Sequence, residues 1–168
     1  MSLPAPSLER LFEFESHLES GFVTLLSNAA ISAFSSRSVS TLDTPYVSLY
    51  CTAGAVLQNH QYIRQGSPSV AFYDWFEGTL TTEVVTNRIT DSEGLPPQHT
   101  VMLGKVRKAI ALPWVKYGWP SDNYIQLPDI RQSETPDTWE DDDSLDHTII
   151  NWYINFQIKS AAWPLSFE

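Results

Sequence analysis

The sequence predicts an α+β fold in which a long N-terminal helix and a second helix pack on one face of a mainly antiparallel sheet. Two observations carry this prediction: apolar residues recur at helical spacing in two segments, and they alternate at period two in several others. These segments follow the order helix, strands, helix, strands, with no internal repeat and no long polar linker between them. We therefore expect a single domain over residues 1–168, with the sheet and the second helix between about residues 45 and 160.

The first predicted element is a helix over about residues 7–34. Ser7 follows two prolines and suits an N-cap, whereas Gly21 marks a weak point or bend inside the helix. A serine-rich stretch then ends the helix. Its apolar stripe, which recurs at steps of three and four residues, consists of Leu11, Phe14, Leu18, Phe22, Leu25, Leu26 and Ala29.

Several later segments carry strand patterns. Alternation over residues 46–51 places Val47, Leu49 and Cys51 on one side of a strand. A β-branched run predicts a strand over residues 70–88, with an interruption near Asp74 or Gly78. A short strand is expected at residues 124–127, and the clearest alternation predicts a last strand over residues 148–159, whose dry face is Ile150, Trp152, Ile154, Phe156 and Ile158.

The second helix is predicted over residues 99–112, where Pro113 ends it. Its basic residues Lys105, Arg107 and Lys108 form the one tight basic group of the sequence, and we interpret them as a solvated helix face. The buried face of this helix is expected to consist of Met102, Val106, Ala109 and Ile110.

Composition and charge exclude several classes of function. A formal net charge of −10 disfavours binding to DNA or to an anionic membrane by charge attraction, so we predict no sequence-specific nucleic-acid binding. No apolar run approaches the ~20 residues that a membrane-spanning helix needs, so no membrane association is expected. The single cysteine, Cys51, lies in an apolar strand pattern and is interpreted as a small buried hydrophobic residue.

Residues 134–147 hold an unusual concentration of acids. A calcium-binding loop needs oxygen ligands at alternate positions and a glycine at the sixth, but the sixth position counted from Asp141 is Asp146. The segment is therefore predicted to be a solvated acidic loop rather than a metal site. The densest part of this loop consists of Glu140, Asp141, Asp142, Asp143 and Asp146.

The sequence contains no catalytic motif. It lacks a G-x-S-x-G elbow, a P-loop and a G-x-G-x-x-G turn, and its four histidines are far apart. We predict no catalytic, cofactor-binding or metal-binding residue. One alternative is a small-molecule-binding or hydrolytic domain that uses His147 or Asp146, and another is an acidic adaptor for a protein partner.

Four of the six tryptophans lie in irregular or terminal segments beside prolines or acids. Core packing is one interpretation of these residues. Tryptophan is also enriched in subunit contacts, and long loops with apolar anchors favour that second interpretation. The predicted interface residues are Trp114, Trp119, Trp139 and Trp163.

The order and character of the segments form a definite layout. An amphipathic N-terminal helix leads to TPYVSLY at residues 44–50, and GTLTTEVVT at residues 78–86 leads to the second helix. The closing strand ends in AAWP at residues 161–164. This layout resembles that of phage tail-terminator and related neck (head–tail joining) proteins, which are small α+β subunits of hexameric rings.

The resemblance implies a structural function. The chain would be a virion subunit that forms a homo-oligomeric ring, ends the tail tube and joins it to the head. Its partners would be other copies and other virion proteins, in the virion or in the bacterial cytoplasm during assembly. The acidic balance suits this role, because a conduit for DNA should repel the phosphates that pass through it. The resemblance also implies that part of the acidic loop, which includes Glu140, Asp141, Asp142, Asp143 and Asp146, faces a lumen or a partner.

Overall fold

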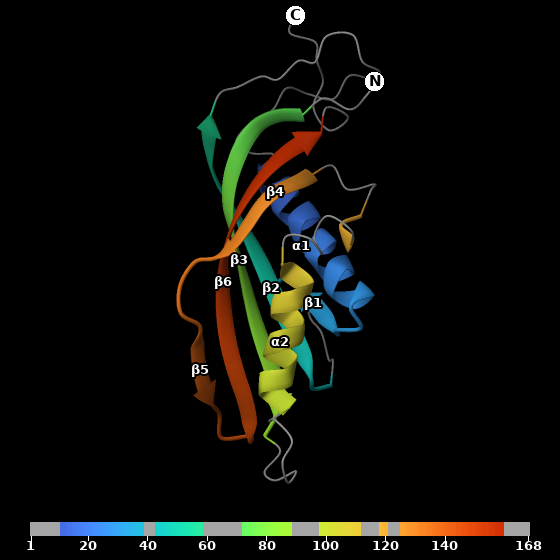
Figure 1. Cartoon of the computed structure of the whole chain (residues 1–168), viewed down its shortest axis with the longest axis vertical. Helices are drawn as coiled ribbons and strands as arrows, with labels where there is room; N and C mark the ends of the chain where they lie inside the picture. The colour runs from blue at the N-terminus through green and yellow to red at the C-terminus, as the bar shows by residue number, and fades with distance from the viewer. Residues whose placement is uncertain are drawn as a thin grey trace, which may run out of the picture.

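The computed structural model describes residues 11–38, 43–58, 72–88, 98–111, 118–120 and 125–159. This part of the chain forms two helices and one six-stranded, mainly antiparallel sheet, which confirms the predicted α+β fold (Figure 1). In chain order the elements are α1 (Leu11–Asn28), β1 (Ala33–Ser35), β2 (Tyr46–Gln58), β3 (Phe72–Asn87), α2 (Gln98–Ile110), β4 (Ile125–Gln132), β5 (Asp137–Glu140) and β6 (Leu145–Lys159).

The sheet is built around two long strands. Its strand order is β1-β2-β3-β6-β4, and β3 pairs with β6 along the whole length of β6. The other edge of β6 is shared, because β4 pairs with its C-terminal half and β5 pairs with its N-terminal part. Among the described strands, β1 alone runs parallel to its neighbour.

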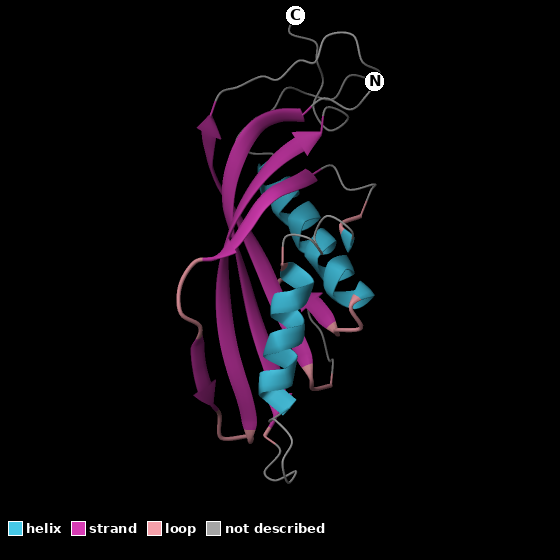
Figure 2. Ribbon diagram, viewed as in Figure 1, coloured by secondary structure: helices cyan, strands magenta, loops and turns pink. Residues whose placement is uncertain are grey.

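Both helices lie on the same side of the sheet, as Figure 2 shows. We call the helix-covered side the inner face and the opposite side the outer face. Successive strand residues point to opposite faces, so the apolar set of each strand is buried against the helices. The predicted burial of Cys51 is confirmed. The buried apolar residues of the inner face and the helices include Leu18, Phe22, Leu25, Leu26, Val47, Leu49, Leu80, Val84, Met102, Val106, Ile110, Ile150, Trp152, Ile154 and Phe156.

The first helix ends earlier than the sequence predicts. Helix α1 stops at Asn28 rather than near residue 34, and residues 1–10 lie outside the described part. The amide of Ile31 donates to the carbonyl of Leu26, and the amide of Ala30 donates to that of Ser27. Ala30 has a φ of 58°, so the chain leaves the helix through a left-handed residue in a Schellman arrangement. An alanine at this position carries no sequence signal for the stop, because glycine is the usual residue there.

The acidic segment is also more ordered than predicted. Residues 137–140 form the strand β5 instead of a loop, and β6 begins at Leu145 rather than at residue 148. Together they make a tight hairpin in which Asp137 pairs with Ile149 and Glu140 pairs with Asp146. A strand of four residues with two acids has too little alternation to be recognised. Its conformation is set by pairing with β6, which is a tertiary effect.

Candidate functional site

A row of contacting side chains crosses the outer face of the sheet near the β5–β6 hairpin. In the strand register, Tyr46 lies opposite Val85, Val85 lies opposite His147, and His147 lies opposite Trp139. Residues directly opposite in neighbouring strands point to the same face, so these four side chains line up across four strands. Val85 is buried although it belongs to the outer face, which shows that this row packs closely.

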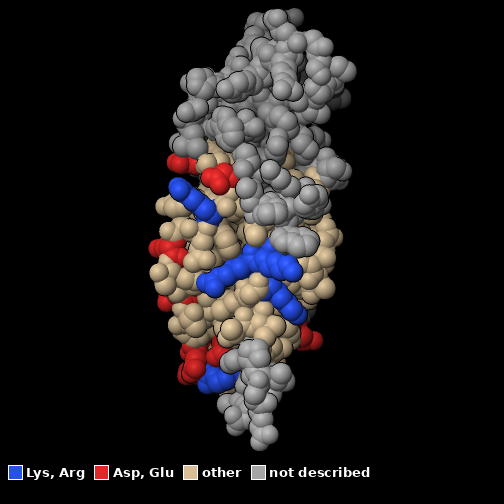
Figure 3. Space-filling model, viewed as in Figure 1, with Lys and Arg blue, Asp and Glu red and all other residues tan. Residues whose placement is uncertain are grey.

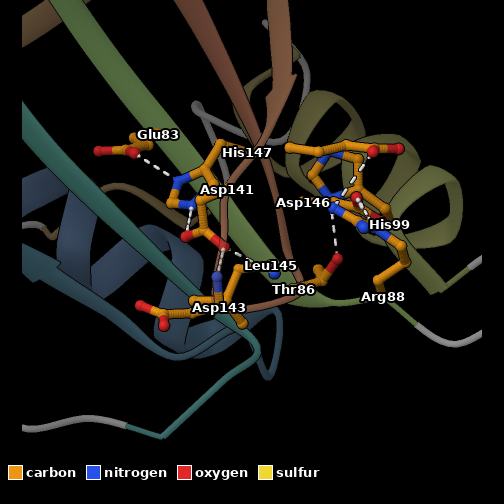
Figure 4. Close-up of polar contacts among 10 residues, drawn as sticks. Glu83, Thr86, Arg88, His99, Asp141, Asp143, Leu145, Asp146 and His147 are labelled. Carbon is orange, nitrogen blue, oxygen red and sulfur yellow. Dashed lines mark hydrogen bonds and ion pairs between the residues drawn. The ribbon is translucent and has the colours of Figure 1, made fainter.

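His147 is held between two carboxylates, as Figure 4 shows. Its Nδ1 lies 2.8 Å from Oε1 of Glu83, and its Nε2 lies 2.6 Å from Oδ2 of Asp141. An ionised carboxylate can only accept a hydrogen bond, so both ring nitrogens donate and the ring is an imidazolium. Glu83 belongs to β3, and Asp141 follows β5. The charged ring therefore ties the turn of the hairpin to the centre of the sheet.

The charges of His147, Glu83 and Asp141, which we call the His147 clamp, stabilise one another. Burial alone lowers the pKa of His147, but the hydrogen bonds and charges of Asp141 and Glu83 outweigh it, and the pKa is raised. The pKa of Asp141 is lowered, first by the hydrogen bond from His147 and then by a backbone amide of the turn. Burial and the same two negative charges raise the pKa of Tyr46. The site is thus arranged to keep one positive charge between two negative ones.

Two further contacts fix the hairpin on the outer side. The indole of Trp139 lies on the imidazole of His147, with ring centroids 5.1 Å apart and an angle of 7° between the planes. Oδ1 of Asp141 accepts the backbone amides of Asp143 and Leu145, each at 2.9 Å, so this carboxylate also closes the turn. The hairpin is therefore shaped by one carboxylate that binds both the turn and the histidine.

A second polar network lies on the inner face, on the other side of the same strands. Nδ1 of His99 lies 2.8 Å from the hydroxyl of Thr86, and its Nε2 lies 2.6 Å from that of Thr148. The hydroxyl of Thr148 is also 3.0 Å from that of Thr138 in β5. Burial lowers the pKa of His99, which keeps this ring neutral. The helix α2 is thereby joined to β3, β6 and β5 through one buried histidine.

Asp146 and His147 are adjacent in sequence but take part in different clusters (Figure 4). Oδ1 of Asp146 lies 3.3 Å from Nε of Arg88. Nη2 of Arg88 lies 3.2 Å from Oε2 of Glu140, in an ion pair without hydrogen-bond geometry. Consecutive strand residues point to opposite faces, so the structure does not bring Asp146 and His147 together as an acid–base pair.

The four tryptophans predicted as interface residues have different environments. Trp119 is half-buried, with its ring centroid 5.1 Å from that of Phe22 in an edge-to-face arrangement and its indole N–H donating to the carbonyl of Ile125 at 2.8 Å. Trp139 is exposed on the outer face. Trp114 and Trp163 lie outside the described residues. Trp119 is therefore held by intramolecular contacts, whereas Trp139 stacks on His147 and keeps 37% of its surface exposed.

The acids predicted to face a partner are also divided. Glu140, Asp141 and Asp146 are engaged with Arg88 or His147. The side chains of Asp142 and Asp143 are exposed at the tip of the hairpin. The tip thus offers negative charge to solvent, while the flanking acids hold the hairpin in place.

Sequence reasoning missed a second ionic cluster beneath β1. Glu15 and Glu19 are buried on α1, and Arg37 contacts them at 2.9 and 2.8 Å. Glu19 also accepts the backbone amide of Cys51 at 3.0 Å and the hydroxyl of Ser35 at 2.7 Å. The one available signal is the four-residue spacing of the two glutamates, which equally describes a solvated helix face.

The described residues assemble neither an acid–base pair at His147 nor a metal-binding cluster. His147 has no nitrogen free to accept a proton from a substrate, since carboxylates occupy both. Within the described ranges, no group of three or more His, Cys, Asp and Glu side chains has a geometry that could hold a metal ion. No helix in that part of the chain is long and apolar enough to cross a membrane. No protein-family model matches the sequence, and no curated protein is significantly similar to it.

Proposed function

We propose that this protein is a structural subunit that assembles with further copies of itself through the outer face of its sheet. In its specific form the proposal is a ring of a phage tail or neck, which ends the tail tube or joins it to the head. The resemblance in the order of elements suggests that specific form. The character of the outer face supports the general one.

The observation that carries the proposal is the distribution of exposed large apolar side chains. Four are found in the described part of the chain: Tyr50, Trp139 and Tyr153 at 42%, 37% and 51% exposure, and Val101 at 39%. The three aromatic residues all lie on the outer face, whereas Val101 lies on α2. Aromatic residues that stay exposed on one rigid face are typical of a surface that another protein covers.

The surroundings of these aromatics resemble an interface in composition. The guanidinium of Arg131 lies 5.6 Å from the ring centroid of Tyr153, and Asn151 and Asn155 belong to the same face. Tyrosine, tryptophan and arginine are the residues most enriched at binding hot spots. None of the described side chains on this face is a lysine, which is one of the residues depleted at interfaces.

The backbone beneath this face is already ordered before a partner binds, so association costs little conformational entropy. Tyr50 and Tyr153 stand on the long strands β2 and β6, which pair with β3 without a register shift around these two residues. Side chains on such strands lose only rotamer freedom when a partner binds, because their backbone is already fixed. A face of this kind suits an assembly of stable geometry.

The test is the mass of the protein in solution, measured by light scattering and sedimentation velocity over a wide range of concentrations. The proposal predicts an oligomer that dissociates on dilution. The double variant Tyr50→Thr/Tyr153→Thr keeps β-propensity and should raise the concentration at half-dissociation at least tenfold, which corresponds to a loss of about 1.4 kcal/mol. The matched control is Val101→Ala, which removes an equally exposed apolar side chain from α2 and should leave the mass unchanged.

Each outcome is informative. A wild-type protein that stays monomeric at millimolar concentration contradicts self-assembly. An oligomer that the tyrosine variant leaves intact, or that Val101→Ala weakens as strongly, shows that the outer face is not the contact surface.

A further inference from the structure

We propose that the free edge of β5 is a docking strand for an extended, lysine- or arginine-rich segment of a partner protein, which adds to the sheet as a further strand. This surface is the edge of the sheet together with the two outer-face side chains of β5, and it needs no second copy of the chain, so the proposal does not depend on self-assembly. It rests on the open backbone of β5, on the way this short strand is held, and on the charge around it.

The register identifies which backbone groups of β5 point outward. The amide of Asp141 donates to the carbonyl of Leu145, so the backbone of Asp141 points towards β6, while the amide of Leu145 donates to Oδ1 of Asp141. Backbone groups alternate in direction along an antiparallel strand, which directs the N–H and C=O groups of Trp139 towards β6 and those of Thr138 and Glu140 away from it. All four residues of β5 are exposed, and in the described part of the chain β6 is the one strand that pairs with β5.

The strand is held in place from both faces. On the outer face, the ring of Trp139 stacks on His147. On the inner face, Thr138 contacts Thr148, and Glu140 contacts Arg88. A four-residue edge strand has few ladder hydrogen bonds of its own, so these side chains fix its extended conformation. An edge that is already ordered can accept a partner strand at a reduced entropic cost.

The charge around this edge decides which partner fits. Seven carboxylates lie between residues 134 and 146, and Arg88 and the protonated His147 neutralise two of them, which leaves five negative charges. Figure 3 shows acidic side chains along the margin of the molecule where β5 lies, with a basic side chain beside the lowest of them, and a larger basic group over α2. Two such edges repel each other, so a second copy of β5 is a poor occupant. A strand that carries Lys or Arg is complementary to it.

The side chains of β5 further specify which partner sequence fits this edge. Asp137 and Trp139 point to the outer face, and Thr138 and Glu140 point to the inner face. A cationic side chain of the added strand can meet Asp137 and the exposed indole of Trp139 together, by an ion pair and a cation–π contact. The expected ligand is therefore an extended segment in which basic residues alternate with β-forming ones.

The probe is a labelled heptapeptide of alternating lysine and valine, KVKVKVK, titrated into the full-length protein at low ionic strength and followed by fluorescence polarisation. Two peptides serve as controls: EVEVEVE reverses the charge, and a KVKVKVK methylated on every backbone nitrogen keeps the charge but cannot donate hydrogen bonds. The proposal predicts that EVEVEVE does not bind and that N-methylation weakens binding at least tenfold. Amide hydrogen exchange should slow at Thr138 and Glu140 when KVKVKVK is bound.

A matched pair of protein variants separates the hairpin from general charge. Asp142→Asn/Asp143→Asn removes two exposed charges at the tip, and Asp43→Asn/Glu77→Gln removes two exposed charges elsewhere. The first should weaken binding of KVKVKVK several-fold, and the second should weaken it clearly less. The proposal is overturned if KVKVKVK does not bind, if its N-methylated form binds equally well, or if both variants have the same effect. The solution mass of the protein tests the proposed self-assembly separately, so a failure of peptide binding does not contradict that proposal.

Discussion

The indole of Trp139 lies nearly parallel to the imidazole of His147, at 5.1 Å between ring centroids, and the two residues come from paired strands of one hairpin. The same imidazole bridges Glu83 in the middle of the sheet and Asp141 at the turn. A single titratable ring thus fixes the hairpin that carries β5. Its protonation state should affect the stability of that region.

The first prediction concerns the pH dependence of this clamp. The pKa of His147 is raised above its ordinary value of 6.5, so the folded state holds the proton more tightly than the unfolded state. The stabilisation is complete below about pH 6.5 and is lost as pH rises through the raised pKa. The variant His147→Gln should lower the free energy of unfolding by about 1–3 kcal/mol at pH 6. Urea unfolding of both proteins from pH 6 to 9 should show this difference shrinking, and a constant difference would contradict the charged clamp.

The second prediction concerns the opposite behaviour of His99. Burial lowers its pKa below 6.5, so the unfolded state binds the proton more tightly. The stability that neutral His99 provides is complete above about pH 6.5 and is lost as pH falls through the lowered pKa. In an NMR titration, the ring signals of His147 should change above pH 6.5 and those of His99 below it. Variants that each lack one of these two histidines assign the ring signals to their residues. A reversed order in the wild-type protein would refute the assignment of charge to the outer face.

The third prediction tests the left-handed end of α1. Ala30 has a φ of 58°, a conformation in which a Cβ atom is unfavourable and glycine is not. Ala30→Gly should therefore raise the free energy of unfolding by about 0.5–1 kcal/mol. Ala29→Gly is the matched control, since Ala29 is equally exposed but has no positive φ, and it should be neutral or destabilising. Equal effects of the two changes in urea unfolding would argue against the Schellman end.

The fourth prediction concerns the buried glutamates of α1. Arg37→Ala removes the cation that contacts both Glu15 and Glu19, while Glu19 stays 3% exposed. The expected loss is about 2–3 kcal/mol, below the range for fully buried pairs because Arg37 is half exposed. Adding Glu19→Gln to this variant should recover part of the loss. Arg107→Ala on the exposed face of α2 should change stability by less than about 0.5 kcal/mol.

The fifth prediction distinguishes two helical glycines. A Cβ on Gly21 would lie within 2.5 Å of Cζ2 of Trp119, whereas a Cβ on Gly104 would meet nothing within 4 Å. Gly21→Ala should therefore destabilise the fold, by about 1–3 kcal/mol for a strained contact. Gly104→Ala should stabilise it by up to about 1 kcal/mol through helix propensity. Thermal unfolding measures both, and a stabilising Gly21→Ala would mean that Trp119 does not pack against α1.

The sequence alone determined the elements that depend on periodic burial. Leu18, Phe22 and Leu25 recur at helical spacing, and Ile150, Trp152 and Ile154 recur at strand spacing, so each set has one apolar face that must be covered. The α+β class, one-sided packing of the helices and burial of Cys51 follow from those patterns. Gly21 was recognised as a weak point of the helix, but its neighbour Trp119 is distant in sequence and was not.

Only the tertiary structure decided the polar arrangements. Glu83 and His147 are 64 residues apart, and Arg37 reaches Glu15 across 22 residues, so no local spacing could indicate either contact. The strand β5 exists because β6 offers it a partner edge, and Asp146 and His147 separate because neighbouring strand residues face opposite sides. Apolar burial repeats along the chain and can be read from it, whereas hydrogen bonds between distant side chains depend on a geometry that exists only after the sheet has formed.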